Sequence, residues 1–454
     1  MKAQKTIMAL LGLLLLAAFG SWALNASYYG LSMLAAGLCC ALFLLAALGL
    51  VPAFAASFAA QDQSPDSLLG RRSLRFARRH PWAQIALAVL ALRLFLYILA
   101  YVADLRVNGY GGGLADGLAR LWLRTDSPSY LGIAQNWYVT EGDPRFHIVF
   151  FPLYPLCIRA LSYLTGGNLF AAALAVSNLC AMGGGILLYE LATLDLPRRE
   201  ALYLTLLGML LPGAMFLGAP MTESLFLLLS LACAYCARRQ RFWLAGLFAA
   251  LAGFTRSVGV LLAALMAFEM LTALMRDGNW QAGRILRYLG CLLLACLGTL
   301  AYLLVNYQVT GSAFTFLTYQ REHWSQSLGF FFNTAAYQTE NLLAALAAGE
   351  ARNAFGLFLP NLLCSFGALG IMLPAVRKVR PSYGAYFLLY FAVAIGCTWL
   401  LSAPRYLAVC FPLAFGLQAL LQDAPKWARW AVPSLLFLSL CAYTCLYILG
   451  YPVY

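Results

Sequence analysis

Seven side chains that can move protons, bind anions or form hydrogen bonds interrupt an otherwise apolar sequence. They are Asp126, His147, Glu223, Arg256, Gln320, Trp324 and Arg405. A carboxylate such as Asp126 can remove the proton from an attacking hydroxyl, which is the role of a general base. An arginine can bind and stabilise an anion in a site with little water. These residue types therefore fit proton transfer beside a bound anion.

Most of these residues also have a purely structural interpretation. Asp126 precedes a Ser-Pro dipeptide, so its carboxylate could cap a helix that begins there. Glu223 could cap the apolar run that follows it. Arg256 and Arg405 could extend toward lipid headgroups, although a lone arginine in an outer turn favours an anionic partner. His147 has no second histidine beside it, so we expect no metal site.

The composition places these residues in a membrane protein. Of the 454 residues, 63% are hydrophobic and only 10% are charged, against about 25% charged residues in soluble domains. No water-soluble fold hides so much apolar surface. The net charge of +13 would suggest nucleic acid in a soluble protein, but basic cytoplasmic loops explain the same excess in a membrane protein. We therefore predict a polytopic membrane protein with no nucleic-acid partner.

Two other features carry no function of their own. The chain has 13 cysteines, and Cys233 and Cys236 form a CxxC. No second pair or histidine cluster accompanies it, which disfavours a zinc or redox role. The apolar N-terminus could be a signal peptide, but a second long apolar run follows at once, so we predict an uncleaved first span.

A helix needs about 20 apolar residues to cross the hydrocarbon layer, and about 13 segments qualify. They lie near 6–26, 28–58, 83–103, 168–190, 201–218, 222–237, 241–255, 257–275, 286–306, 354–375, 383–401, 405–421 and 429–449. The run 241–275 is interpreted as two short spans bent at "GFTRSVG". The alternative, one long tilted helix, would move the "RKVR" segment to the outer side.

Charge predicts the orientation of these spans. With a cytoplasmic N-terminus, most of the 30 Lys and Arg residues fall in inner loops, as the positive-inside rule requires. The inner loops include "RRSLRFARRH" at 71–80, "RRQR" at 238–241 and "RKVR" at 377–380. The long outer loops are then 104–167 and 307–353. We expect the active site on this outer face, periplasmic or extracellular in a bacterium and luminal in a eukaryote.

The outer face also collects the polar chemistry. Ionisable residues at membrane depth usually face a polar cavity or a partner, so we expect the outer residues named above to share one cavity. Residues 129–138 show an amphipathic stripe too short to span, as does the segment after "FFPLYPL". We predict that both are interfacial helices that lie on the membrane plane.

Four ordered blocks resemble a known family. They are "DSPSYLGIAQNWY" with "FFPLYPL", "PGAMFLGAPMTESLFLLLSL" with "FTRSVG", "VTGSAFTFLTYQREHW", and "APRYLAVCFPL". Together they cover about 126–415 and resemble the PIG-V-like group of integral-membrane GT-C glycosyltransferases. The chain departs from the family pattern at Thr125, where the family has Trp, and at Trp137, where it has Gly. Segment 1–60 resembles an addition of two N-terminal transmembrane helices before a GT-C-like catalytic domain at 83–450.

The resemblance implies an all-α, GT-C-type helical bundle that transfers a hexose, commonly mannose, from a polyprenyl- or dolichyl-phosphate sugar. The acceptor would be a lipid or glycan, and membrane lipids are the other partners. No cofactor, metal or nucleotide sugar is expected. Asp126 is the predicted general base, and Arg256 and Arg405 are predicted to hold the donor phosphate. The predicted substrate-binding residues are Tyr130, His147, Glu223, Gln320, Trp324 and Tyr406.

Two other classes remain open. A transporter or flippase for a lipid-linked glycan would use the same cavity and arginines but would need no base; the absence of clear inverted halves argues weakly against it. A membrane scaffold would tolerate substitution of both Asp126 and Arg405.

Overall fold

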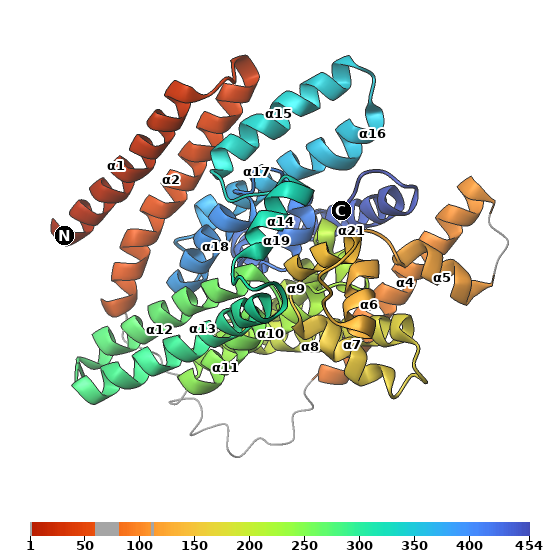
Figure 1. The fold of residues 1–454 in the computed structure, drawn as a ribbon. Helices are drawn as coiled ribbons and strands as arrows, with labels where there is room; N and C mark the ends of the chain where they lie inside the picture. The colour runs from red at the N-terminus through yellow and green to blue at the C-terminus, as the bar shows by residue number, and fades with distance from the viewer. Residues whose placement is uncertain (1, 60–80, 110–112) are drawn as a thin grey trace.

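The chain folds almost entirely into helices. The computed structural model describes residues 2–59, 81–109 and 113–454 (Figure 1). In that part of the chain, β-structure is limited to one isolated bridge between Leu328 and Cys397. The predicted all-α fold of an integral, multi-pass membrane protein is confirmed. The basic segment 71–80, predicted to be an inner loop, lies outside the described residues.

Eight of the described helical segments are long and apolar enough to cross a membrane. They comprise α1 (Lys2–Asn25), α2 (Gly30–Ala59), α4 (Trp82–Asn108), α8 (Leu169–Ala192), η3 (Ser257–Leu261) with α12 (Leu262–Asp277), α13 (Ala282–Thr310), α16 (Ala351–Asn353) with η4 (Ala354–Phe358) and α17 (Leu359–Ala375), and α21 (Lys426–Ile448).

The other five predicted spans form shorter helices, so the count of 13 full spans is not confirmed. They correspond to α9 (Arg198–Met209) with η2 (Pro212–Leu217), α10 (Glu223–Arg238), α11 (Phe242–Gly253), α18 (Pro381–Ala394), and α19 (Ala403–Ala408) with α20 (Pro412–Leu421). Pro212, Pro404 and Pro412 start new helices and break these apolar runs. Such irregular backbone is tolerated at membrane depth when surrounding protein buries it, and most residues of these helices are buried.

The two predicted outer loops also contain helices. Segment 104–167 includes α5 (Leu114–Trp122), α6 (Ser127–Asn136), the 3-10 helix η1 (Asp143–Val149) and α7 (Leu153–Ser162). Segment 307–353 includes α14 (Thr315–Trp324) and α15 (Phe331–Ala347). The two short helices predicted after Asp126 and in "FFPLYPL" thus form as α6 and α7.

Helix α15 is longer than an outer loop would suggest. It lies along α2, and α1 and α2 form a pair at the edge of the bundle (Figure 1). The ring of Phe331 packs against Phe43 at 4.4 Å, and the Trp22 indole donates to the Asn333 amide oxygen at 3.0 Å. These contacts join the N-terminal pair to the second outer segment.

The run 241–275 bends, as predicted. Helix α11 ends at Gly253, and η3 and α12 follow. A Cβ atom on Gly259 would lie 2.4 Å from the Ala252 carbonyl oxygen, and one on Gly298 would lie 1.6 Å from the Ala250 carbonyl oxygen. Glycine therefore permits both the bend and the close packing of α13 on α11.

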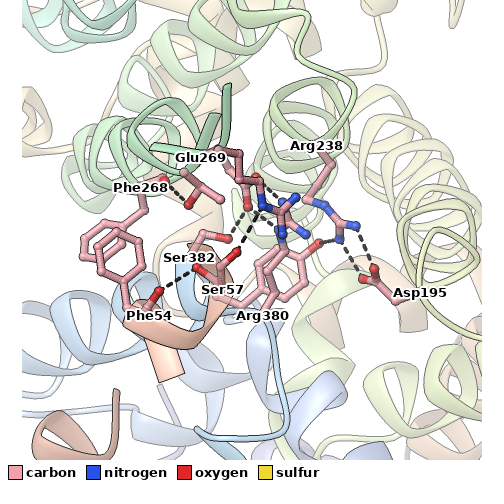
Figure 2. A network of polar contacts seen from close by, with 11 residues as sticks. Phe54, Ser57, Asp195, Arg238, Phe268, Glu269, Arg380 and Ser382 are labelled. Atoms are coloured by element: carbon pink, nitrogen blue, oxygen red, sulfur yellow. Dashed lines mark hydrogen bonds and ion pairs between the residues drawn. The ribbon is translucent and has the colours of Figure 1, made fainter. Parts of the chain in front are cut away.

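A polar network marks the end of α10 opposite Glu223 (Figure 2). Arg380 donates to the Glu269 carboxylate at 2.6 and 2.7 Å, and Arg238 donates to Asp195 at 2.6 and 2.7 Å. Ser382 also donates to Glu269. Arg238 also donates to the Tyr383 hydroxyl at 3.0 Å, so the segments 238–241 and 377–380, both predicted to lie on the inner side, are close together.

Candidate active site

Arg405 is the centre of a second network, at the start of α10. Its Nη1 donates to Asp126 Oδ2 at 2.7 Å, and its Nε donates to Glu223 Oε1 at 2.6 Å. Arg256 donates to the same Glu223 oxygen and, at 3.0 Å, to the Thr222 hydroxyl. Four predicted site residues from distant parts of the sequence therefore form one connected cluster.

Arg405 belongs to α19, and hydrogen bonds to the backbone around the start of α19 fix the position of this helix. The Asn361 amide oxygen accepts from the Ala403 N–H at 2.8 Å. Asn361 and Gln338 both donate to the Leu400 carbonyl, at 3.0 and 2.7 Å. On the other side η2 approaches so closely that a Cβ atom on Gly213 would lie 2.0 Å from the Pro404 carbonyl oxygen. Any larger residue there would push α19 away.

Side chains of α4 hold the segment that leads to Glu223. The Tyr97 hydroxyl donates to the Gly218 carbonyl at 2.6 Å. Arg93, which is 1% exposed, donates to the Met209 and Ala214 carbonyls at the junction of α9 and η2. A broken helix leaves carbonyls without intrahelical partners, and Arg93 satisfies two of them.

Arg256 occupies the bend between α11 and η3. Its guanidinium lies 5.5 Å from the Tyr406 ring centre, a cation–π distance. Two residues earlier in the bend, the Phe254 carbonyl accepts from the Leu153 N–H at 3.2 Å, which joins the start of α7 to the same bend. The arginine side chain is 15% exposed. Tyr406, which follows Arg405 in the sequence, therefore lies in the cluster against Arg256.

Asp126 is not a side-chain helix cap. It occupies the position before α6, but its carboxylate makes no capping hydrogen bond and pairs with Arg405 instead. Thr125 adopts a left-handed φ of 53° just before it and turns the chain at that point. The Asp126 side chain is 29% exposed, while that of Glu223 is 0% exposed. Of the two acids, only Asp126 is open to an incoming molecule.

Aromatic rings extend the cluster on one side. Tyr130 is buried, with its ring 5.1 Å from Phe150. Phe150 in turn lies 5.9 Å from Trp324 and 6.2 Å from His147. Tyr130, His147 and Trp324 thus surround one phenylalanine that sequence reasoning did not single out. An aromatic wall of this kind suits the apolar face of a sugar ring.

The surroundings of two predicted substrate-binding residues, Gln320 and His147, determine how each can interact. Gln320 donates to the Gln326 side chain at 2.5 Å, and Gln326 donates to the Trp399 carbonyl at 2.7 Å, so Gln320 points toward the 399 segment. Burial, and the nearby charge of His323, lower the pKa of His147 below its usual 6.5. His147 is therefore neutral at pH 7 and able both to donate and to accept hydrogen bonds.

The electrostatics of the cluster balance. Two carboxylates face two guanidinium groups, so the network is neutral without a ligand. Glu223 Oε2 is buried and has no hydrogen-bond partner among the described residues, and a buried carboxylate oxygen without a partner is costly. We infer that Glu223 positions the two arginines. Within the described ranges no group of three His, Cys, Asp or Glu side chains could hold a metal ion.

Sequence reasoning missed Thr222, Arg93 and the pair Asn361 and Gln338. Thr222 adjoins Glu223 in the "MTES" turn, and Arg93 is a single charge inside an apolar span, so both carried a usable signal. Asn361 and Gln338 stand in unremarkable apolar helices. Their importance arises only from the backbone that folds against them.

Comparison with known proteins supports the motif resemblance. No protein-family model matches the chain. The chain is 32% identical to GPI alpha-1,6-mannosyltransferase 2 of Mus musculus over 168 residues. This aligned region covers 35% of the chain and 32% of the relative. The chain is also 32% identical over 158 residues to the protein of the same name from Cricetulus griseus, covering 33% and 30% of the two chains. The match spans about a third of the length of these curated relatives, and the predicted resemblance to PIG-V-like proteins is confirmed.

Solved structures of a second membrane protein are also similar. The crystal structure of ArnT from Cupriavidus metallidurans bound to undecaprenyl phosphate has a TM-score of 0.48 and 15% identity, covering 77% of this chain and 62% of ArnT. Its apo state has a TM-score of 0.47 and 14% identity, with 77% and 61% coverage.

Proposed function

We propose that this chain is a GT-C-type membrane mannosyltransferase that uses a polyprenyl-phosphate mannose donor and a lipid or glycan acceptor. The observation that carries the proposal is the 2.7 Å bond between Asp126 and Arg405. It joins the exposed carboxylate that could act as base to a cation that could hold a phosphate. The similarity to the mouse mannosyltransferase supports the choice of sugar.

The proposed reaction is a direct displacement at the anomeric carbon. The acceptor oxygen attacks that carbon and forms the new glycosidic bond, while the bond from the carbon to the phosphate oxygen breaks. The electron pair leaves with the polyprenyl phosphate, and Asp126 takes the proton of the acceptor hydroxyl. Attack opposite the leaving group inverts the anomeric configuration. No cofactor is required by this sequence of bond changes.

Arg405 and Arg256 would stabilise the departing phosphate. The guanidinium of Arg405 donates hydrogen bonds through Nε and Nη1, and that of Arg256 through Nη1 alone. Their other N–H groups have no hydrogen-bond partner among the described residues. A phosphate that binds these groups of Arg405 would share the guanidinium with Asp126 and weaken its ion pair with that carboxylate. Donor binding would therefore free the carboxylate for its role as base.

We place this site on the outer face of the membrane, with a cytoplasmic N-terminus. The proposal rests on the distribution of basic residues. It is supported by the two networks at opposite ends of α10, because the basic segments predicted for the inner face meet at Arg238 while the candidate site lies at Glu223.

Product analysis tests the function against the flippase alternative. Purified protein in detergent, given polyprenyl-phosphate mannose and candidate acceptors, should release free polyprenyl phosphate together with a mannosylated product. A flippase would instead move the donor across a vesicle membrane and leave it chemically intact. Transport without release of polyprenyl phosphate would overturn the proposal.

A further inference from the structure

A cavity of about 740 Å³ opens beside the candidate active site. Its walls are the turn before α6 (Arg124 and Thr125), the segment 349–353 around α16, and the residues that follow α21. Thr125 lines the cavity and directly precedes Asp126 in the sequence, so the cavity reaches the turn that carries the candidate base. No residue predicted from the sequence to bind substrate lines it.

Two arginines meet in this cavity. Arg124 Nη1 donates to the Tyr447 and Ile448 carbonyls, each at 2.8 Å, and Arg352 Nη2 donates to the Gly450 carbonyl at 2.5 Å. The Nη2 atoms of Arg352 and Arg124 lie 3.3 and 4.0 Å from the point where a Cβ on Gly450 would stand. The two guanidinium groups therefore share the space around one glycine.

Capping alone explains only part of this arrangement. Basic side chains commonly bind the last carbonyls of a helix, where the helix dipole is negative, and Arg124 does so for α21. One arginine would satisfy those carbonyls, yet the structure gathers two cations. Each guanidinium has five N–H donors, so both retain donors that can face the cavity.

The two arginines differ from those of the candidate site in their ion pairing. In the part of the chain that the structure describes, neither Arg124 nor Arg352 has a carboxylate within 4.0 Å, whereas Arg256 and Arg405 both do. Glu350 also lines the cavity, and its Oε2 accepts from the Asn353 amide at 2.7 Å. Both cavity arginines thus keep N–H groups that no carboxylate occupies, and arginine pairs of this kind match the geometry of phosphate.

We propose that this cavity binds the phosphate group of a lipid acceptor and holds its headgroup against Asp126. The site deepens the proposed function and rests on it. Phe355 and Leu346 flank the turn that carries Arg352, and they are 48% and 49% exposed. These apolar side chains favour a lipid over a free phosphate ester, because they can contact acyl chains while the arginines hold the headgroup.

Binding to the purified full-length protein tests the site directly. The probes are short-chain phosphatidylglycerol, glycerol phosphate and short-chain phosphatidylcholine, with affinity read from intrinsic tryptophan fluorescence. We expect phosphatidylglycerol to bind tightest, and the double variant Arg124→Gln with Arg352→Gln to weaken it at least tenfold. The single variant Arg352→Lys, which keeps the charge, should lose less. Arg159→Gln, an exposed arginine on α7 outside the cavity, is the control and should bind as the wild type does.

Two results would overturn the site. One is equal affinity for phosphatidylglycerol in the double variant and the Arg159→Gln control, with unfolding temperatures showing that both are folded. The other is equal affinity for glycerol phosphate and phosphatidylglycerol, which would overturn the assignment to a lipid.

Turnover separates this proposal from the proposed function. If the wild type releases polyprenyl phosphate from the donor, the double variant should raise the KM for an anionic lipid acceptor while the KM for the donor stays unchanged. An unchanged acceptor KM would overturn the cavity and leave the transferase standing. Phosphatidylglycerol binding that depends on the two arginines, in a protein that never turns over the donor, would support the cavity and overturn the transferase.

Discussion

The Arg405 guanidinium donates to the Asp126 carboxylate at 2.7 Å across 279 positions of sequence. The same guanidinium binds Glu223, which is fully buried, while Asp126 is 29% exposed. Glu223 therefore holds Arg405 from the buried side, and Asp126 contacts it from the solvent-accessible side. A ligand anion that took the place of Asp126 on Arg405 would release the exposed carboxylate of the pair.

Glu223→Gln should destabilise the protein strongly. The substitution leaves two largely buried arginines with only Asp126 as an anionic partner, and breaking a buried ion pair in this way costs about 3–5 kcal/mol. The unfolding midpoint in a fixed detergent measures the effect. Asp277→Asn is the matched control, because its pair with Arg284 has a carboxylate that is 48% exposed and such pairs contribute about 0–1 kcal/mol. Equal shifts in the two variants would contradict the positioning role.

Gly213→Ala should reduce turnover by displacing α19. Its Cβ would lie 2.0 Å from the Pro404 carbonyl oxygen, so the backbone next to Arg405 must move. Gly367→Ala is the control, because nothing lies within 4 Å of a Cβ there and alanine favours a helix by about 0.5–1 kcal/mol. We expect loss of turnover only in Gly213→Ala. Loss in both variants, or in neither, would show that this contact does not position the site.

Arg256→Gln and Arg405→Gln should each weaken donor binding more than acceptor binding. Both arginines are assigned to the donor phosphate, and hydrogen bonds to a charged group contribute about 1.5–3 kcal/mol. Titration with polyprenyl-phosphate mannose gives the donor affinity, and Arg159→Gln controls for loss of a positive charge elsewhere. Equal losses for donor and acceptor would remove the assignment.

The lowered pKa of His147 should make the folding stability depend on pH. Burial, and then the charge of His323, lower the pKa of His147 below 6.5. Below about pH 6.5 the unfolded chain therefore binds a proton more readily than the folded chain does, and folding stability falls as the pH drops toward the lowered pKa. Above that window the residue has no such effect. His147→Asn should lose this part of the pH dependence, and His323→Asn should reduce it. An unaltered pH profile in His147→Asn would contradict the assignment.

The sequence predicted the all-α membrane fold and the grouping of four charged residues, but not the lengths of the helices. Asp126, Glu223, Arg256 and Arg405 stood out because charges are rare in apolar sequence, and the structure joins all four. Hydropathy could not separate a full span from a short helix packed inside the bundle. Helix α11, with 12 residues, is about 18 Å long at 1.5 Å per residue, which is too short to cross about 30 Å of hydrocarbon.

Whether Asp126 caps a helix could be decided only from the three-dimensional structure. A Ser-Pro dipeptide after an acid predicts a side-chain cap, and the local sequence contains nothing against it. The competing partner, Arg405, comes from α19, whose place depends on Asn361 and Gly213. A long-range ion pair of this kind overrides the local preference, so only tertiary structure could decide between the two.

Asp126→Asn tests directly whether Asp126 is the general base. The variant keeps the size of the side chain but cannot take a proton, and general bases contribute about 10²–10⁴-fold to rate. Asp116→Asn, an exposed acid on α5, is the control. With polyprenyl-phosphate mannose and an acceptor, we predict that Asp126→Asn folds and binds donor but releases polyprenyl phosphate at least about 100-fold more slowly. Full turnover in a folded, donor-binding Asp126→Asn protein would show that Asp126 is not the general base.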